Sequence, residues 1–216
     1  MERTTPPTDA GILLDLDGTL VDTVYLHVNA WAAAFAAEGQ RQPMWRIHRA
    51  IGLGSTRLVA HLLGGTPDPY LLCQLVDGHR RRFLDRAEEL VPTRGALELL
   101  DDLQEREVPT VVATSAGGPE REALMAALGD PDLPVTDASS ADDSKPGPAP
   151  LVLAAEQLPS SAAILMVGDT VWDGHAARRA GHRFIGVRCG GIGTAEMEQA
   201  GADLVADDPA GLIGLL

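Results

Sequence analysis

Apolar and polar positions follow two different rhythms along the chain. After a polar, proline-containing start, an apolar run from Gly11 ends in two carboxylates, Asp15 and Asp17, and predicts a buried parallel strand over 11–17. Helical periodicity then dominates residues 22–90, where no strand pattern occurs. The helices expected in this segment span 24–38, 44–63 and 69–89.

From residue 91 onwards, strands and helices alternate. Strands are expected at 108–114, 133–137, 163–167, 182–187 and 202–205, with helices at 94–107, 119–128, 149–157, 171–180 and 194–200. Such alternation is typical of a parallel sheet covered on both faces. We therefore predict an α/β fold: a Rossmann-like core formed by residues 1–21 and 91–216, with an inserted all-helical cap at 22–90. Ligands of such sheets bind at the carboxyl ends of the strands.

Composition and charge narrow the possible partners. The chain has 31 acidic and 17 basic residues, a formal net charge of −14, which disfavours nucleic acid. Its apolar runs fall short of the ~18 residues of a membrane span, and its start has no signal-peptide pattern. Cys73 and Cys189 are expected to be unpaired, as in a reducing compartment. These features predict a cytoplasmic protein without a nucleic-acid or membrane partner. We expect a monomer or a homodimer, although the residues do not specify the oligomeric state.

The first polar strand end is Asp15-Leu16-Asp17-Gly18-Thr19. Residues two apart on a strand point the same way, so both carboxylates can face one site. A divalent cation or a shared proton would compensate their repulsion. Asp15 could then act as a nucleophile and Asp17 could transfer a proton. The alternative is a solvated acidic turn.

Three further strand ends carry polar side chains. Thr114 and Ser115 precede a helix, whose free N–H groups with these hydroxyls suit a phosphate, although N-capping alone would explain them. Lys145, the only lysine of the chain, supplies a point charge for a phosphate or carboxylate, or is a solvated loop residue. Asp169 could join Asp15 around Mg²⁺, with Asp173 four residues further on, or these acids simply complement a helix dipole.

Taken in order, these pieces resemble the haloacid dehalogenase-like superfamily, in the phosphatase branch with a small helical cap. The resemblance implies that Asp15 attacks phosphorus and becomes an aspartyl-phosphate. It implies that Asp17 is the general acid and base, with its backbone carbonyl on Mg²⁺. Thr114 and Lys145 would hold the phosphoryl group. The metal site implied by the resemblance comprises Asp15, Asp17, Asp169 and Asp173.

Residues expected to contact the substrate are Gly18, His27, Arg57 and Ser115. His27 and Trp31, four apart, resemble the first cap helix of β-phosphoglucomutases and sugar-phosphate phosphatases, although Trp31 could instead lie in the cap core. Ser55 stands where a mutase would carry an arginine for the distal phosphate. Arg57, or one of residues 80–82, could substitute for that arginine.

The function expected from the resemblance is a Mg²⁺-dependent phosphomonoesterase that hydrolyses a small phosphorylated metabolite, either a sugar phosphate or phosphoglycolate. The alternatives are a β-phosphoglucomutase-like phosphomutase and a non-catalytic phosphate-binding protein. Asp17 argues against dehalogenation, which needs no acid there, and the absence of lysine from 22–90 argues against a Schiff-base phosphonate hydrolase. Cap closure is expected about hinges near 19–23 and 90–94.

Overall fold

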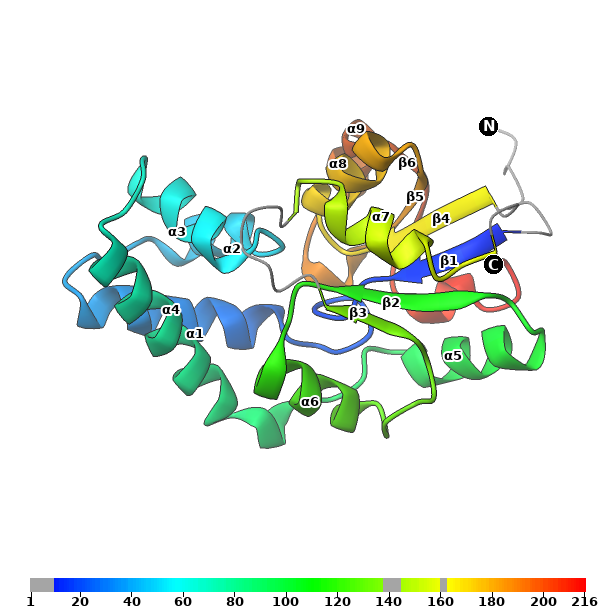
Figure 1. The fold of residues 1–216 in the computed structure, drawn as a ribbon, viewed down its shortest axis with the longest axis horizontal. Coiled ribbons are helices and arrows are strands. Elements are labelled where there is room, and N and C mark those ends of the chain that lie inside the picture. Colours follow the sequence, from blue (N-terminus) through cyan, green and yellow to red (C-terminus); the bar gives the residue numbers. More distant parts are fainter. Residues whose placement is uncertain (1–9, 138–144, 160–162) are drawn as a thin grey trace.

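A computed structural model describes residues 10–137, 145–159 and 163–216. Within them, six parallel strands form one sheet in the order β3-β2-β1-β4-β5-β6 (Figure 1). The strands are β1 (Ala10–Leu14), β2 (Thr110–Thr114), β3 (Val135–Asp137), β4 (Ala163–Gly168), β5 (Arg183–Val187) and β6 (Ala202–Ala206). The strand order reverses direction at β1, which is where a doubly wound sheet opens a crevice for ligands. The predicted α/β fold is confirmed.

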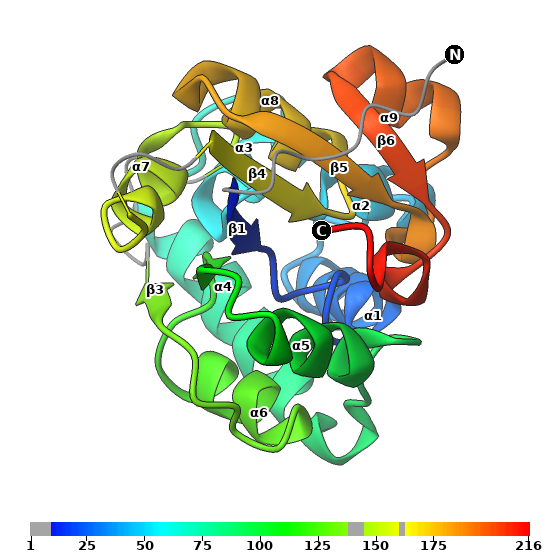
Figure 2. The same cartoon turned by 90° about the vertical axis from the view of Figure 1, so that its right-hand side faces the viewer.

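Helices cover both faces of the sheet, as Figure 2 shows. They are α5 (Ala96–Glu105), α6 (Gly118–Ala127), α7 (Ala149–Ala155), α8 (Val171–Ala180) and α9 (Thr194–Ala200). Alternate residues of β1 enter different cores: Ile12 and Leu14 pack in the cluster that includes α5 and α6, whereas Leu13 packs in the cluster that includes α7, α8 and α9. This alternation explains the continuous apolar run of the strand, because both of its faces are buried.

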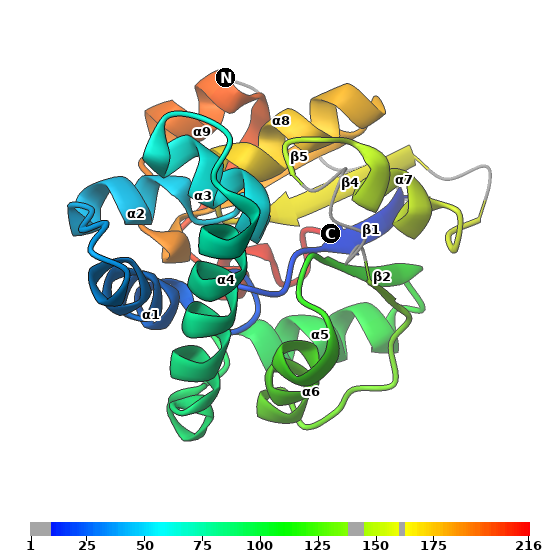
Figure 3. The same cartoon turned by 60° about the vertical axis from the view of Figure 1, so that its left-hand side comes forward.

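An all-helical insert separates β1 from β2 and lies beyond the carboxyl end of β1 (Figure 1). It comprises α1 (Val24–Ala37), α2 (Met44–Ala50), α3 (Ser55–Leu63) and α4 (Pro69–Leu84). It has an apolar cluster of its own, in which Trp31, Phe35 and Leu75 are buried. Figure 3 shows α1 and α4 packed side by side. Among the described residues, no helix is long and apolar enough to cross a membrane.

Several predicted boundaries were wrong. The single helix expected at 44–63 is two helices, which residues 51–54 separate. Gly52 in this segment has a φ of 93°, a backbone conformation that a helix does not contain. The first strand ends at Leu14, so that Asp15 and Asp17 lie beyond it, and the helix expected to reach 89 ends at Leu84. The end of that expected helix is a separate short 3₁₀ turn at Ala87–Glu89, and the 3₁₀ turns at Arg188–Gly190 and Pro209–Leu212 were not predicted.

The two linkers of the insert run side by side. Val21 bridges both Asp17 and Pro92, and Asp22 N donates to Val91 O at 2.9 Å. The buried Thr93 Oγ1 donates to Thr19 O at 2.5 Å. This paired linker coincides with the predicted hinges, while hinge motion and the predicted boundaries at 21/22 and 90/91 stay predictions.

Candidate active site

The carboxyl end of β1 places Asp15 over the centre of the sheet. Its backbone N–H donates to Val167 O of β4 at 2.9 Å, which holds the residue in register with the neighbouring strand. Its buried side chain lies 2.5 Å from Lys145 Nζ. Lys145 Nζ also lies 2.6 Å from Asp173 Oδ1. The only lysine of the chain therefore joins two carboxylates from different strand ends.

Burial governs the protonation of this cluster. Burial raises the pKa of Asp15 to about 7, although Lys145 acts to lower it. Burial acts to lower the pKa of Lys145, but Asp15 and Asp173 outweigh it and hold that pKa above its usual value, so Lys145 is a cation. The pKa of Asp169 is raised by burial and then by Asp173 and Asp15. One lysine thus does not neutralise the buried carboxylates around it.

The surplus of carboxylates fits a divalent cation. Asp15, Asp169 and Asp173 each offer an oxygen, and these three atoms lie within 4.8 Å of one another. Asp169 Oδ1 accepts from Thr19 Oγ1 at 3.2 Å, whereas its Oδ2 is buried without a hydrogen-bond partner in the described part of the chain. Carboxylate oxygens are the ligands Mg²⁺ prefers, so Asp15 and Asp169 could hold it. The metal role expected of the Asp17 backbone carbonyl stays a prediction.

Glycines allow other segments to approach Asp169. A Cβ on Gly18, which has a φ of 78°, or on Gly190 would collide with the Asp169 carboxylate. The lack of a side chain at Gly18 therefore allows the Asp169 carboxylate to pack against it. Gly18 is buried and does not line the cavity described below. A larger residue at either position would push the carboxylate out of the cluster.

The first turn of α8 fixes Asp173. Its Oδ2 accepts from Thr170 N at 3.0 Å and from Thr170 Oγ1 at 2.6 Å, as part of a capping box at the N-terminus of the helix. Its Oδ1 is then aimed at Lys145. Asp173 is thus placed to orient Lys145 as well as to offer an oxygen to a cation, and the expectation that it binds metal stays a prediction.

Two hydroxyls follow β2. Thr114 is buried at the strand end, and its Oγ1 accepts from Ala116 N at 2.9 Å. Ser115 is exposed and borders the cavity. Both lie just before α6, and the N-terminus of a helix favours an anion.

Asp17 begins a row of polar side chains that crosses from core to insert. Asp17 Oδ1 lies 2.9 Å from His27 Nε2, and His27 Nδ1 lies 2.9 Å from His79 Nε2. His79 Nδ1 lies 3.8 Å from Glu120 Oε1. Burial is the main reason that the pKa of His79 lies well below its usual value, and the nearby His27 and Arg80 lower it further. This imidazole is therefore neutral.

The row is held in place by aromatic packing. The His27 ring stacks on Phe83 with centroids 4.0 Å apart, and Trp31 stacks on His79 at 4.2 Å. Trp31 lies in the cap core and also borders the cavity. His79 and Glu120 were not anticipated from sequence; the signal available for His79 was a polar residue on the buried face of an amphipathic helix.

A cavity of about 90 Å³ separates Asp15 from the insert. Its lining comes from both sides: Asp15, Asp17, Ser115, Ala116, Glu120 and Lys145 of the core, and His27, Trp31, Ile51, Gly52, Leu53, Gly54, Ser55, Leu58 and His79 of the insert. Of the four residues expected to contact substrate, His27 and Ser115 border this cavity, whereas Gly18 and Arg57 do not.

Polar contacts fasten the insert over the cavity. His48 Nε2 lies 2.9 Å from Gly190 O, and Trp172 Nε1 donates to Arg49 O at 3.3 Å. The Arg49 guanidinium pairs with both Glu196 carboxylate oxygens, at 2.7 and 2.9 Å. The structure thus holds the insert closed over the strand ends.

Comparisons with known proteins agree with this architecture. A family model described as haloacid dehalogenase-like hydrolase matches residues 10–181. N-acetylmuramic acid 6-phosphate phosphatase from Pseudomonas aeruginosa is 31% identical over 218 residues, which cover 95% of this chain and 93% of that protein. Protein CbbY from Cereibacter sphaeroides is 33% identical over 221 residues, or 94% of each chain.

Among solved structures, a hydrolase from Pseudomonas syringae has a TM-score of 0.89 at 31% identity, covering 95% of this chain and 96% of its own. The resemblance carried by the four strand-end motifs is therefore confirmed over nearly the whole chain. On the evidence of these matches, the buried acidic cluster and the helical insert, the chain belongs to the haloacid dehalogenase-like hydrolases.

Proposed function

We propose that this protein is a Mg²⁺-dependent phosphomonoesterase that transfers a phosphoryl group from a small metabolite to Asp15 and then to water. The observation that carries the proposal is that Asp15, Asp17 and Lys145 line one covered cavity, with the buried Asp169 carboxylate close to that of Asp15. A phosphoryl group needs positioning and charge compensation more than unusual reactive groups. The phosphatase named among the relatives supports the same reaction class.

In the first half-reaction, an Asp15 carboxylate oxygen bonds to phosphorus while the bond from phosphorus to the alcohol oxygen breaks. Asp17 gives its proton to that leaving oxygen. Lys145 and the N-terminal amides of α6 compensate the phosphoryl oxygens. Mg²⁺, held by Asp15 and Asp169, would supply further positive charge on those oxygens.

In the second half-reaction, water attacks the phosphorus of the aspartyl-phosphate and the bond to Asp15 breaks. Asp17, now a carboxylate, accepts the proton of that water, so both groups return to their starting states. The hydrogen bond between Asp17 Oδ1 and His27 Nε2 orients the carboxyl group for both transfers. The closed insert limits access of bulk water to the cavity.

The test is phosphate release from p-nitrophenyl phosphate and a panel of metabolite esters, with and without Mg²⁺. Asp15→Asn should abolish release, whereas Asp101→Asn, on the exposed side of α5, should not. Release that survives in Asp15→Asn, or no release by the native protein from any ester, would overturn the proposal.

A further inference from the structure

The cavity above Asp15 has an uneven charge lining. Its acidic members are Asp15, Asp17 and Glu120, and Lys145 is its one lysine or arginine within the described residues. Lys145 is already paired with Asp15 and Asp173. Of the segments outside the description, 138–144 and 160–162 contain no lysine, arginine or histidine, whereas 1–9 contains Arg3. The two histidines of the lining are His27, which already lies 2.9 Å from Asp17, and His79, which is neutral. Among the described lining residues, no second lysine or arginine is therefore present to meet a second anion.

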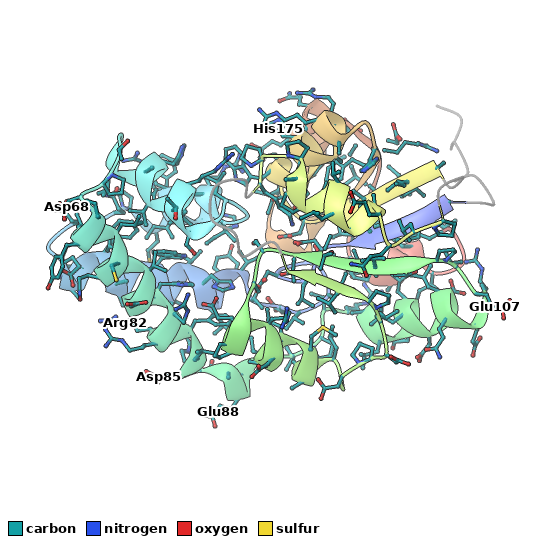
Figure 4. All side chains as sticks on the ribbon, in the orientation of Figure 1. Asp68, Arg82, Asp85, Glu88, Glu107 and His175 are labelled. Carbon is teal, nitrogen blue, oxygen red and sulfur yellow. The ribbon has the colours of Figure 1, made fainter. Side chains whose placement is uncertain are left out.

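The arginines of the insert do not border this cavity. Arg82 Nη1 donates to Gly78 O of its own helix at 2.8 Å, and Figure 4 shows Arg82 projecting from α4 on the side away from the sheet. Arg80 pairs with Asp77 at 3.6 Å, and Arg49 pairs with Glu196. Arg57, expected to contact substrate, is not among the lining residues. None of Arg57, Arg80, Arg81 and Arg82, the expected substitutes for the mutase arginine, is among the described residues that line the cavity.

Glu120 is the acidic residue of the lining that the proposed reaction does not use. It lies in the first turn of α6, and 17% of its side chain is exposed. Its one ion-pair contact among the described residues is with His79 at 3.8 Å, too long for a hydrogen bond. Burial raises the pKa of Glu120 and Asp17 raises it further, and these effects outweigh the opposing effects of His27 and Arg80. Its oxygens can therefore accept hydrogen bonds from a ligand in the cavity.

Building on the proposed function, we propose that the substrate is a sugar monophosphate without a second anionic group, and that Glu120 accepts a hydrogen bond from a hydroxyl or amino group of the leaving sugar. A carboxylate or second phosphate in the same place would meet Glu120 without a compensating cation. Of the two substrates expected from sequence, this selects the sugar phosphate over phosphoglycolate. It also disfavours the phosphomutase alternative, because a mutase must bind a bisphosphate.

The experiment compares kcat/KM for sugar phosphates with and without a carboxylate, in native enzyme and in variants of Glu120, so that each ester serves as its own reference for shape. One set is glucosamine 6-phosphate, glucose 6-phosphate and 6-phosphogluconate; the other is N-acetylglucosamine 6-phosphate and N-acetylmuramic acid 6-phosphate. The uncharged or amino members should be preferred over the carboxylate members by at least about tenfold, the effect of a like charge within roughly 10 Å at an effective dielectric constant of about 20. Preference for the carboxylate members would overturn the inference.

Glu120→Gln removes the charge and keeps the shape, so the preference should shrink by about tenfold. Glu122→Gln, on the exposed face of the same helix, is the matched control and should retain the native ratio. Because the readout is a ratio within one variant, a loss of folded protein does not imitate the result. An unchanged ratio in Glu120→Gln would overturn the role of Glu120. If the native enzyme hydrolyses none of the esters, including p-nitrophenyl phosphate, the proposed function itself would be overturned.

Discussion

Replacing Lys145 by methionine isolates the electrostatic role of the only lysine. The side chain is 2% exposed, and its Nζ lies 2.5 Å from Asp15 and 2.6 Å from Asp173. Methionine keeps most of the apolar stem but removes the charge. Two buried carboxylates then lose their cation, and Asp169 beside them already has an oxygen without a hydrogen-bond partner among the described residues. Removing one partner of a buried ion pair costs about 3–5 kcal/mol, so we expect Lys145→Met to lose that much stability at pH 8.

The loss should depend on pH, with a definite sign. The pKa of Asp15 lies at about 7 in the folded protein against 3.8 as a reference, so folding binds a proton between these values. Stability from this group is greatest below about pH 4 and falls as pH rises through 7. Lys145 lowers the pKa of Asp15, so its removal raises that pKa further. Protonation of Asp15 at pH 5 should therefore relieve part of the cost.

Urea unfolding in EDTA at pH 5 and pH 8 measures this difference. Arg106→Met is the control, because it removes a partly exposed cation paired with Asp102 at 2.9 Å, a pair worth at most about 1 kcal/mol. Equal losses for the two variants at pH 8, or a loss in Lys145→Met that is the same at both pH values, would refute the reasoning.

Three further predictions concern the cap and the thiols. His27→Asn should lower kcat by about 100-fold with little change in KM, because Asp17 loses its orienting partner; a loss no larger than that of the exposed His61→Asn would contradict this. Glu196→Gln weakens the ion pair with Arg49 that fastens the insert, so kcat/KM should fall several-fold. The free energy of unfolding measured in urea should change by less than about 1 kcal/mol. Unchanged kinetics would count against the fastening role. Iodoacetamide followed by peptide mass analysis should modify exposed Cys73 before Cys189, whose pKa is raised by burial and Asp169; equal rates would contradict this.

The sheet and the core of the site could be predicted because they follow from local patterns. Each strand is an apolar run, and parallel strands present their ends at one edge, so polar residues after β1, β2 and β4 had to meet there. Lys145 could be singled out because no other lysine occurs in the chain. Its two carboxylate partners lie 130 and 28 positions away in sequence, and no local pattern specifies which acid it pairs with.

The wall of the cavity could not be predicted in the same way. His79 and Glu120 come from α4 and α6, and tertiary packing, not a local motif, brings their side chains together. The break between α2 and α3 was missed because apolar spacing continues through 51–54, although Gly52 and Gly54 could have indicated it. Substrate preference depends on these parts, which is why the sequence left it open.

The central claim is that Asp15 carries the phosphoryl group during turnover. The most direct measurement is acid quenching of the enzyme during steady hydrolysis of a good ester, followed by peptide mass analysis. The account predicts that the peptide containing Asp15 gains the mass of one phosphoryl group, that hydroxylamine removes it, and that Asp15→Asn shows none. Turnover at the native rate without phosphorylated Asp15 in the quenched enzyme, or a label on another residue, would contradict it.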